Sequence, residues 1–224
     1  SSEYVRRAAA EALVQIGTPA VPALVKALRD SSEYVRRAAA EVLGKLGDPQ
    51  VIPVLIKALR DRDEYVRCAA AWALGKLGDP QVIPVLIKAL RDRNGGVRRV
   101  AAEVLGKLGD PQAIPALIQA LRDRNVDVRH AAVWALGKLG DPQAIPALIQ
   151  ALRDRNVDVY VAAVEALVQI GAPAVPALIQ VLGDSDRDVR RAAAKALGEI
   201  GDPQAAPALS VWAHTGKDAA RNAL

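Results

Sequence analysis

A short motif recurs along the whole chain with a fixed period. A Val-Arg step returns every 30 or 31 residues, at Val5, Val35, Val66, Val97, Val128 and Val189, and in one further repeat Val159 is followed by Tyr160. A glycine keeps the same period at Gly17, Gly47, Gly78, Gly109, Gly140, Gly171 and Gly201. A period of this size indicates stacked supersecondary units, each of which buries its apolar face only against its neighbours. The sequence therefore predicts one elongated repeat protein.

Residues 48–78 show how one repeat is built. Asp48 is suited to cap a helix, and Pro49 follows at the first helical position, where its missing N–H costs nothing. Apolar residues at helical spacing predict a first helix up to residue 59, and a polar turn separates it from a second helix over about 64–77. Gly78 then ends the second helix in a left-handed conformation. Each repeat is thus predicted to be a pair of helices.

The same pattern divides the chain into successive repeats. Gly75 lies inside the second helix, and glycines at the equivalent positions of other repeats predict that a neighbouring helix passes close by. We expect one solenoid over 1–224, made of a half repeat 1–17, full repeats 18–47, 48–78, 79–109, 110–140, 141–171 and 172–201, and a degenerate terminal repeat 202–224.

Composition excludes several classes of protein. Phe and Met are absent, so Ala, Leu, Val and Ile must form the core, and no apolar run reaches the ~18 residues that span a bilayer. No leader resembling a signal peptide precedes the repeats, and the first residue is not Met, as expected of an excised or processed segment. Cys68 is the only cysteine, which excludes an internal disulfide. Cytoplasmic localisation is the default expectation, with no membrane association.

The consensus Asp-Pro-Gln-x-Ile-Pro-x-Leu-Ile-x-Ala-Leu-x-Asp…Val-Arg-x-x-Ala-Ala-x-x-Leu-Gly-x-Leu-Gly resembles the HEAT-like repeats named after the phycobilin lyase subunits. It is also similar to artificial α-helical scaffolds built from that consensus, and the resemblance covers residues 1–209. It implies an all-α fold, a right-handed superhelix of about seven repeats. It further implies that the second helices line a concave, ligand-facing side. Turn aspartates and Val-Arg arginines would form an internal ladder, which Tyr160 interrupts.

The repeats differ from one another mainly along one stripe of the second helix. Its four positions per repeat, such as Tyr65, Cys68, Trp72 and Lys76, lie at spacings of 3, 4 and 4 residues and so share one face. Trp is the residue most enriched at binding hot spots, and Glu or Lys occupies the Trp position elsewhere. The alternative is that each indole packs on the stems of nearby Lys or Arg. The predicted partner-binding residues are Tyr34, Arg37, Tyr65, Cys68, Trp72, Arg99, Glu103, His130, Trp134, Lys138 and Glu165.

Nucleic-acid binding and catalysis are not favoured. The stripe carries nine cationic and eight acidic side chains, which does not make a phosphate channel despite the net charge of +5. His130 and His214 lack metal-ligand spacing, so no metal site is predicted. Cys68 and His130 would lie ~20 Å apart, too far for a catalytic dyad. We expect neither enzymatic activity nor a cofactor.

The sequence thus predicts a non-enzymatic scaffold, natural or designed, that binds a protein partner on its concave face. Two alternatives stay open: a subunit similar to bilin lyases that holds a tetrapyrrole, and a DNA-binding HEAT-like protein that uses its tryptophans. The first helix leaves Val5, Leu13 and Ile16 without a preceding partner, which predicts end-to-end self-association.

Overall fold

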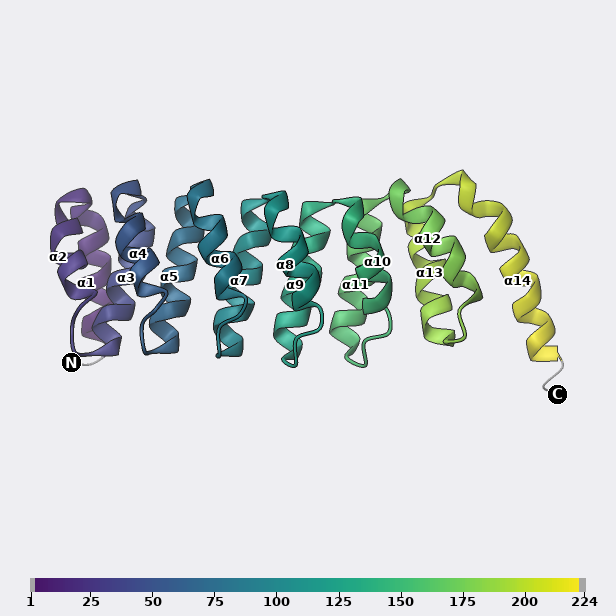
Figure 1. The fold of residues 1–224 in the computed structure, drawn as a ribbon, viewed down its shortest axis with the longest axis horizontal. Helices are drawn as coiled ribbons and strands as arrows, with labels where there is room; N and C mark the ends of the chain where they lie inside the picture. Colours follow the sequence, from purple (N-terminus) through teal and green to yellow (C-terminus); the bar gives the residue numbers. More distant parts are fainter. Residues whose placement is uncertain (1–2, 222–224) are drawn as a thin grey trace. The chain divides into compact units, whose positions relative to one another are not determined.

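The computed structural model describes residues 3–221, and the side chains of residues 4–5 and 7–213. All regular elements in this range are helical, which confirms the all-α prediction. Figure 1 shows short and long helices alternating along the chain. The side chains of Arg6 and His214, both singled out in the sequence, lie outside the described ones.

The predicted second helices are the long ones, and each has 14 residues. They are α1 (Glu3–Ile16), α3 (Glu33–Leu46), α5 (Glu64–Leu77), α7 (Gly95–Leu108), α9 (Val126–Leu139), α11 (Val157–Ile170) and α13 (Arg187–Ile200). The short helices between them are α2 (Val21–Ala27), α4 (Ile52–Ala58), α6 (Ile83–Ala89), α8 (Ile114–Ala120), α10 (Ile145–Ala151) and α12 (Val175–Gln180). The last helix, α14, covers Ala206–Arg221.

The first helix of each repeat starts differently from the prediction. Pro49 opens a 3-10 turn, Pro49–Val51, and the α-helix begins only at Ile52. The cause is Pro53, which has no N–H to donate to the carbonyl of Pro49 as an α-helix requires. The amide of Ile52 donates to that carbonyl instead, which is the tighter 3-10 pattern.

The predicted caps Asp48 and Gly78 are both present, and Asp63 caps the second helix. Asp48 accepts a hydrogen bond from the amide of Gln50, and Asp63 accepts from the amides of Tyr65 and Val66. Gly78 ends α5 with φ of 68° and ψ of 11°, the left-handed conformation that favours glycine. Asp63 and Gly78 fix where α5 begins and ends, and therefore which of its side chains share a face.

The chain forms two compact units, Ser1–Ala116 and Leu117–Leu224. In the first unit α3 packs along α5 and α5 along α7, and in the second α9 packs along α11. The core between helices is aliphatic, and Leu43, Leu74 and Leu136 are fully buried.

Close approach between long helices depends on the internal glycines. A Cβ added at Gly44 would lie 2.6 Å from the Cα of Ala73 in the next long helix, and one at Gly75 would lie 2.5 Å from a methyl of Val104. These contacts confirm the predicted close approach. At Gly198, by contrast, an added Cβ meets nothing within 4 Å.

Two interfaces between successive long helices are packed more loosely than the others described below, and the sequence analysis did not predict this. Val14 and Val168 replace the internal glycine, and α1 and α11 contact the following long helix less extensively than α3, α5 and α9 do. After α1, where the repeat has 30 residues and not 31, Gly17 has φ of 78° and ψ of −148°, and no side chain caps the turn that follows.

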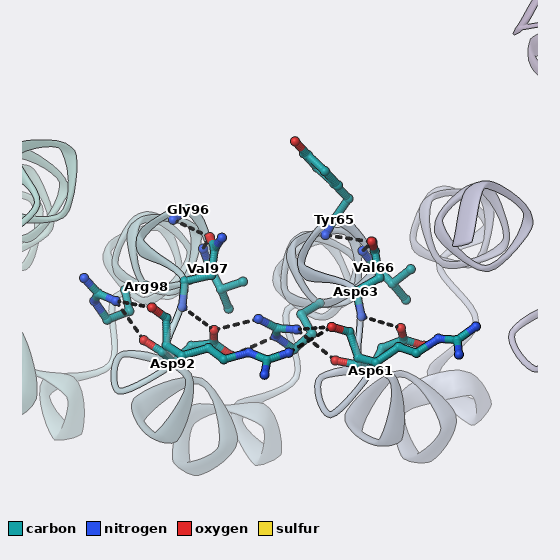
Figure 2. A network of polar contacts seen from close by, with 12 residues as sticks. Asp61, Asp63, Tyr65, Val66, Asp92, Gly96, Val97 and Arg98 are labelled. Atoms are coloured by element: carbon teal, nitrogen blue, oxygen red, sulfur yellow. Dashed lines mark hydrogen bonds and ion pairs between the residues drawn. The ribbon is translucent and has the colours of Figure 1, made fainter. Parts of the chain in front are cut away.

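The resemblance implied an arginine–aspartate ladder, and the structure contains it. Arg36 donates from Nε and Nη2 to both carboxylate oxygens of Asp61, at 2.8 and 2.9 Å, and from Nη1 to the carbonyls of Asp30 and Ser31. Figure 2 shows Asp61 and Asp92 in successive repeats within this network, with the ring of Tyr65 pointing away from it. Arg67 makes the equivalent bidentate contact with Asp92, and Arg129 makes it with Asp154.

Tyr160 interrupts the ladder, as the resemblance implied. The aspartate that an arginine at this position would contact, Asp184, still has a cationic partner. Arg153, in the turn before α11, contacts the carboxylate of Asp184. The hydroxyl of Tyr160 lies 3.5 Å from the carbonyl of Asp188. The guanidinium of Arg153 therefore takes the place of the one that an arginine at position 160 would have supplied.

The ladder predicts loss of stability in acid. Burial would raise the pKa of Asp61, but the hydrogen bonds from Arg36 and from the amide of Asp63 outweigh it and hold that pKa below the ordinary 3.8. The pKa of Asp154 is lowered in the same way by Arg129. A folded-state pKa below the unfolded one contributes stability above the unfolded value, and this contribution disappears as pH falls through the folded value.

We therefore expect the urea midpoint to be constant near neutrality and to fall below about pH 4. An Asp61→Asn variant is measured at pH 7 and below about pH 4. It should be less stable than the parent at pH 7, and its urea midpoint should fall less in acid. An identical decrease in the variant and the parent would contradict the assignment to Asp61.

The N-terminal surface is partly apolar. Val5 is 59% and Ile16 57% exposed, while Leu13 is half-buried. End-to-end self-association stays a prediction, which light scattering over a concentration series would test. In the described residues no single helix is long and apolar enough to cross a membrane, although two bent helix pairs pass that test by length and composition.

Candidate protein-interaction surface

The variable stripe forms one face of the long helices, which we call the long-helix face. In the first unit it contains an open groove of about 580 Å³ across α3, α5 and α7. Ala69, Ala73 and Val100 contribute apolar lining. Five of the predicted residues line this groove together: Arg37, Tyr65, Cys68, Trp72 and Arg99.

Two aromatic rings in the groove are in contact with cations from neighbouring helices. The ammonium of Lys107, on α7, lies 4.1 Å from the ring centroid of Trp72, on α5. The guanidinium of Arg37, on α3, lies 5.8 Å from the centroid of Tyr65. Each contact contributes about 0.5–1 kcal/mol at an exposed site. The structure thus contains the packing of an indole against a lysine that was the alternative interpretation of Trp72.

The cations that line the groove differ in whether they form ion pairs. Arg37 is paired with Glu41 at 2.7 Å, and Arg99 is paired with Glu103 one helical turn away. The hydrogen bond that Arg37 donates to Glu41 holds the pKa of Arg37 above its ordinary value, so this side chain stays charged. Lys45 and Lys76 also line the groove, and neither forms an ion pair with a described residue.

Cys68 is half-buried in the groove wall. Burial raises the pKa of its thiol, and the nearby charges of Arg99 and Arg67 offset this only in part. The thiol is therefore protonated at neutral pH, unlike the low-pKa thiolates of reactive cysteines. In this environment Cys68 acts as a small apolar side chain.

The second unit has a separate and more acidic hollow of about 460 Å³. Its lining includes His130 and Glu165 from the predicted set, together with Asp127 and Asp158. Val161 contributes an exposed apolar side chain. Trp134 and Lys138 do not line this hollow; they contact each other, with the ammonium 6.0 Å from the ring centroid.

The structure therefore divides the predicted site. Trp72 and Trp134 belong to different units, each with its own surroundings, and Tyr34 lines a neighbouring hollow with Arg7 and Glu11. The stripe in the first unit carries six cations and three carboxylates, and in the second three cations and five carboxylates. Summing the charge over the whole stripe concealed this difference.

Lys45, Lys76 and Lys107 are functional candidates that the predicted set did not include. All three are exposed and recur once per repeat on successive long helices of the first unit. Their regular spacing in the sequence was the available signal. In the described part of the chain, no group of three or more His, Cys, Asp or Glu side chains is placed to hold a metal ion.

Comparison with known proteins agrees with this architecture. The sequence profile of HEAT repeats matches residues 21–99, 83–159 and 145–224, and that of the PBS lyase HEAT-like repeat matches residues 5–30. The chain belongs to the HEAT-repeat family. No curated protein matches it in sequence.

Solved structures extend the comparison. A chain of the complex of CpcE and CpcF of phycocyanin lyase from Nostoc sp. PCC7120 is 33% identical, with a TM-score of 0.61 over 84% of this chain and 79% of that chain. Two engineered proteins are 24% and 23% identical, each with a TM-score of 0.55. They cover 81% and 95% of this chain, and 96% and 69% of their own. At this identity the engineered proteins support the fold alone.

Proposed function

We propose that this protein is a non-enzymatic scaffold that binds a protein partner through its long-helix face. The observation that carries the proposal is the groove of the first unit, in which aromatic and cationic side chains gather at positions where the repeats differ. The framework positions, by contrast, are occupied by caps, core leucines and the ladder. Large aromatic side chains with partly exposed faces are typical of binding hot spots.

A partner titration of single variants tests this proposal. Replacing Trp72 with alanine should weaken binding by about thirtyfold, equivalent to ~2 kcal/mol, because the indole is the largest side chain that lines the groove. The fold should be little affected, since Glu103 occupies the equivalent position in the next repeat. The partner is first captured from lysate on the parent protein, and Trp134→Ala is titrated in parallel as the equivalent change in the second unit.

Thermal unfolding of both variants provides the control. If Trp72→Ala melts at a much lower temperature yet binds the partner as the parent does, the indole is structural and the groove is not the binding site. The proposal is also contradicted if Trp72→Ala captures the same proteins from lysate, in the same amounts, as the parent does.

A second candidate is a role similar to a phycocyanin lyase subunit, with a bilin held on the long-helix face. The 33% identity to a chain of the CpcE–CpcF complex favours it. Mixing the protein with phycocyanobilin and recording the visible absorbance spectrum tests this function. A shifted and sharpened band that Trp72→Ala abolishes would support it, whereas an unchanged spectrum would exclude it.

A further inference from the structure

The first unit contains a row of lysines with a regular spacing. Lys45, Lys76 and Lys107 occupy the same position of α3, α5 and α7, exactly one repeat apart in sequence. None of them forms an ion pair with a described residue. Packed helices lie about 8–10 Å apart, so the backbone positions of these lysines recur at about this distance. Lys45 and Lys76 line the groove, and the ammonium of Lys107 reaches over the ring of Trp72.

A polyproline II segment has a matching period. It rises 3.1 Å per residue with three residues per turn, so every third side chain points the same way at intervals of about 9.3 Å. An acidic residue at every third position of such a segment would therefore present one carboxylate to each lysine. A fully stretched β-strand alternates its faces at every residue, so side chains three positions apart point to opposite sides.

The floor of the groove fits the residues between those carboxylates. Trp72 is half-buried beside Ala69 and Val100, and its ring is held in place by Lys107. Grooves lined by aromatic side chains are the usual receptors for proline-rich segments, which are already extended before binding. Glu41 and Glu103 compensate Arg37 and Arg99. Glu64 also lines the groove, but the three lysines outnumber this carboxylate, so the surface keeps a net positive charge.

We propose that the groove of the first unit binds an extended acidic peptide segment of a partner protein, with carboxylates at every third residue paired to Lys45, Lys76 and Lys107. The inference rests on the proposed protein-binding function and specifies the chemistry of the partner. The segment crosses α3, α5 and α7, and an apolar residue or proline of the segment packs on Trp72. The acidic hollow of the second unit is not part of this site.

Synthetic peptides test the proposal directly. The main probe is a peptide with glutamate at every third position and proline or leucine between, titrated against the full chain by calorimetry. A second peptide has the same composition with its glutamates in one block, and a third has lysine in place of glutamate. A fourth peptide carries glutamate at every seventh position in a helix-forming sequence, because two turns of a helix advance a similar ~10.5 Å.

Only the first peptide should bind well, and added salt should weaken it. Trp72→Ala should weaken binding about thirtyfold. Lys76→Gln, a change at an exposed position, should weaken it about threefold, as expected for one exposed ion pair. The matched control Lys57→Gln, at an exposed position of the short helix α4 that does not line the groove, should leave the affinity unchanged.

Several results would overturn the proposal. Equal affinity for the block peptide would refute the spacing, tighter binding of the heptad peptide would make the partner a helix, and equal affinity for the lysine peptide would refute the charge argument. Tighter binding of a single-stranded oligothymidylate, with the same dependence on Lys76, would make the ligand a nucleic acid. If no peptide binds but capture from lysate still requires Trp72, this inference fails and the proposed function stands; if capture does not require Trp72 either, both fail.

Discussion

Replacing Asp61 with alanine is expected to lower the free energy of unfolding by about 3–5 kcal/mol. The reason is the guanidinium left behind. The side chain of Arg36 is only 6% exposed, and Asp61 accepts two of its hydrogen bonds. Without the carboxylate, Arg36 keeps only the carbonyls of Asp30 and Ser31, and its charge is buried without a counterion.

Urea unfolding followed by circular dichroism measures this effect. The matched control is Glu11→Ala, which removes the carboxylate of an exposed pair with Arg7. That pair should contribute no more than about 0.5 kcal/mol, because solvent screens it. Equal losses in the two variants would show that burial of the ladder does not determine its strength.

The substitution Gly44→Ala is expected to destabilise the protein by about 2 kcal/mol, although alanine is the better helix former. The new methyl would lie 2.6 Å from the Cα of Ala73, and a backbone atom cannot rotate away as a side chain can. Helices α3 and α5 would have to separate, which loosens the packing of both.

The equivalent change at Gly198 separates the packing effect from helix propensity. Because the added Cβ meets no atom within 4 Å there, Gly198→Ala should leave stability unchanged or raise it by up to about 1 kcal/mol. The two variants are compared by their urea midpoints. A similar stabilisation of both would mean that the long helices can move apart at no cost.

Most of the fold could be predicted because each repeat is specified locally. Asp48, Pro49 and Gly78 determine helix ends through their own backbone chemistry, and the period places the same determinants in each repeat. The 3-10 turn before Ile52 was not predicted, although Pro53 contains the information for it. The loose interface at Val14 was not predicted either, since the distance between helices depends on how two surfaces fit.

The candidate site was predictable only in part. Helical spacing placed Tyr65, Cys68 and Trp72 on one face, and the structure brings them together in one groove. The contact between Lys107 and Trp72 joins different repeats, and spacing within one helix does not reveal it. The division of charge between the units likewise follows from where each unit ends, which the uniform period does not mark.

The ladder also bears on how such a chain can change in length during evolution. Each arginine contacts an aspartate 25 residues further along, in the next repeat. An in-frame duplication of one repeat copies a donor and an acceptor together, so the new repeat provides a carboxylate for the preceding arginine and an arginine for the following carboxylate. Residues 110–128 and 141–159 are identical, as expected after such an event. A lineage with this ladder can gain or lose whole repeats in one genetic step without leaving a buried charge unpaired, and can thereby lengthen its recognition surface before any point mutation alters it.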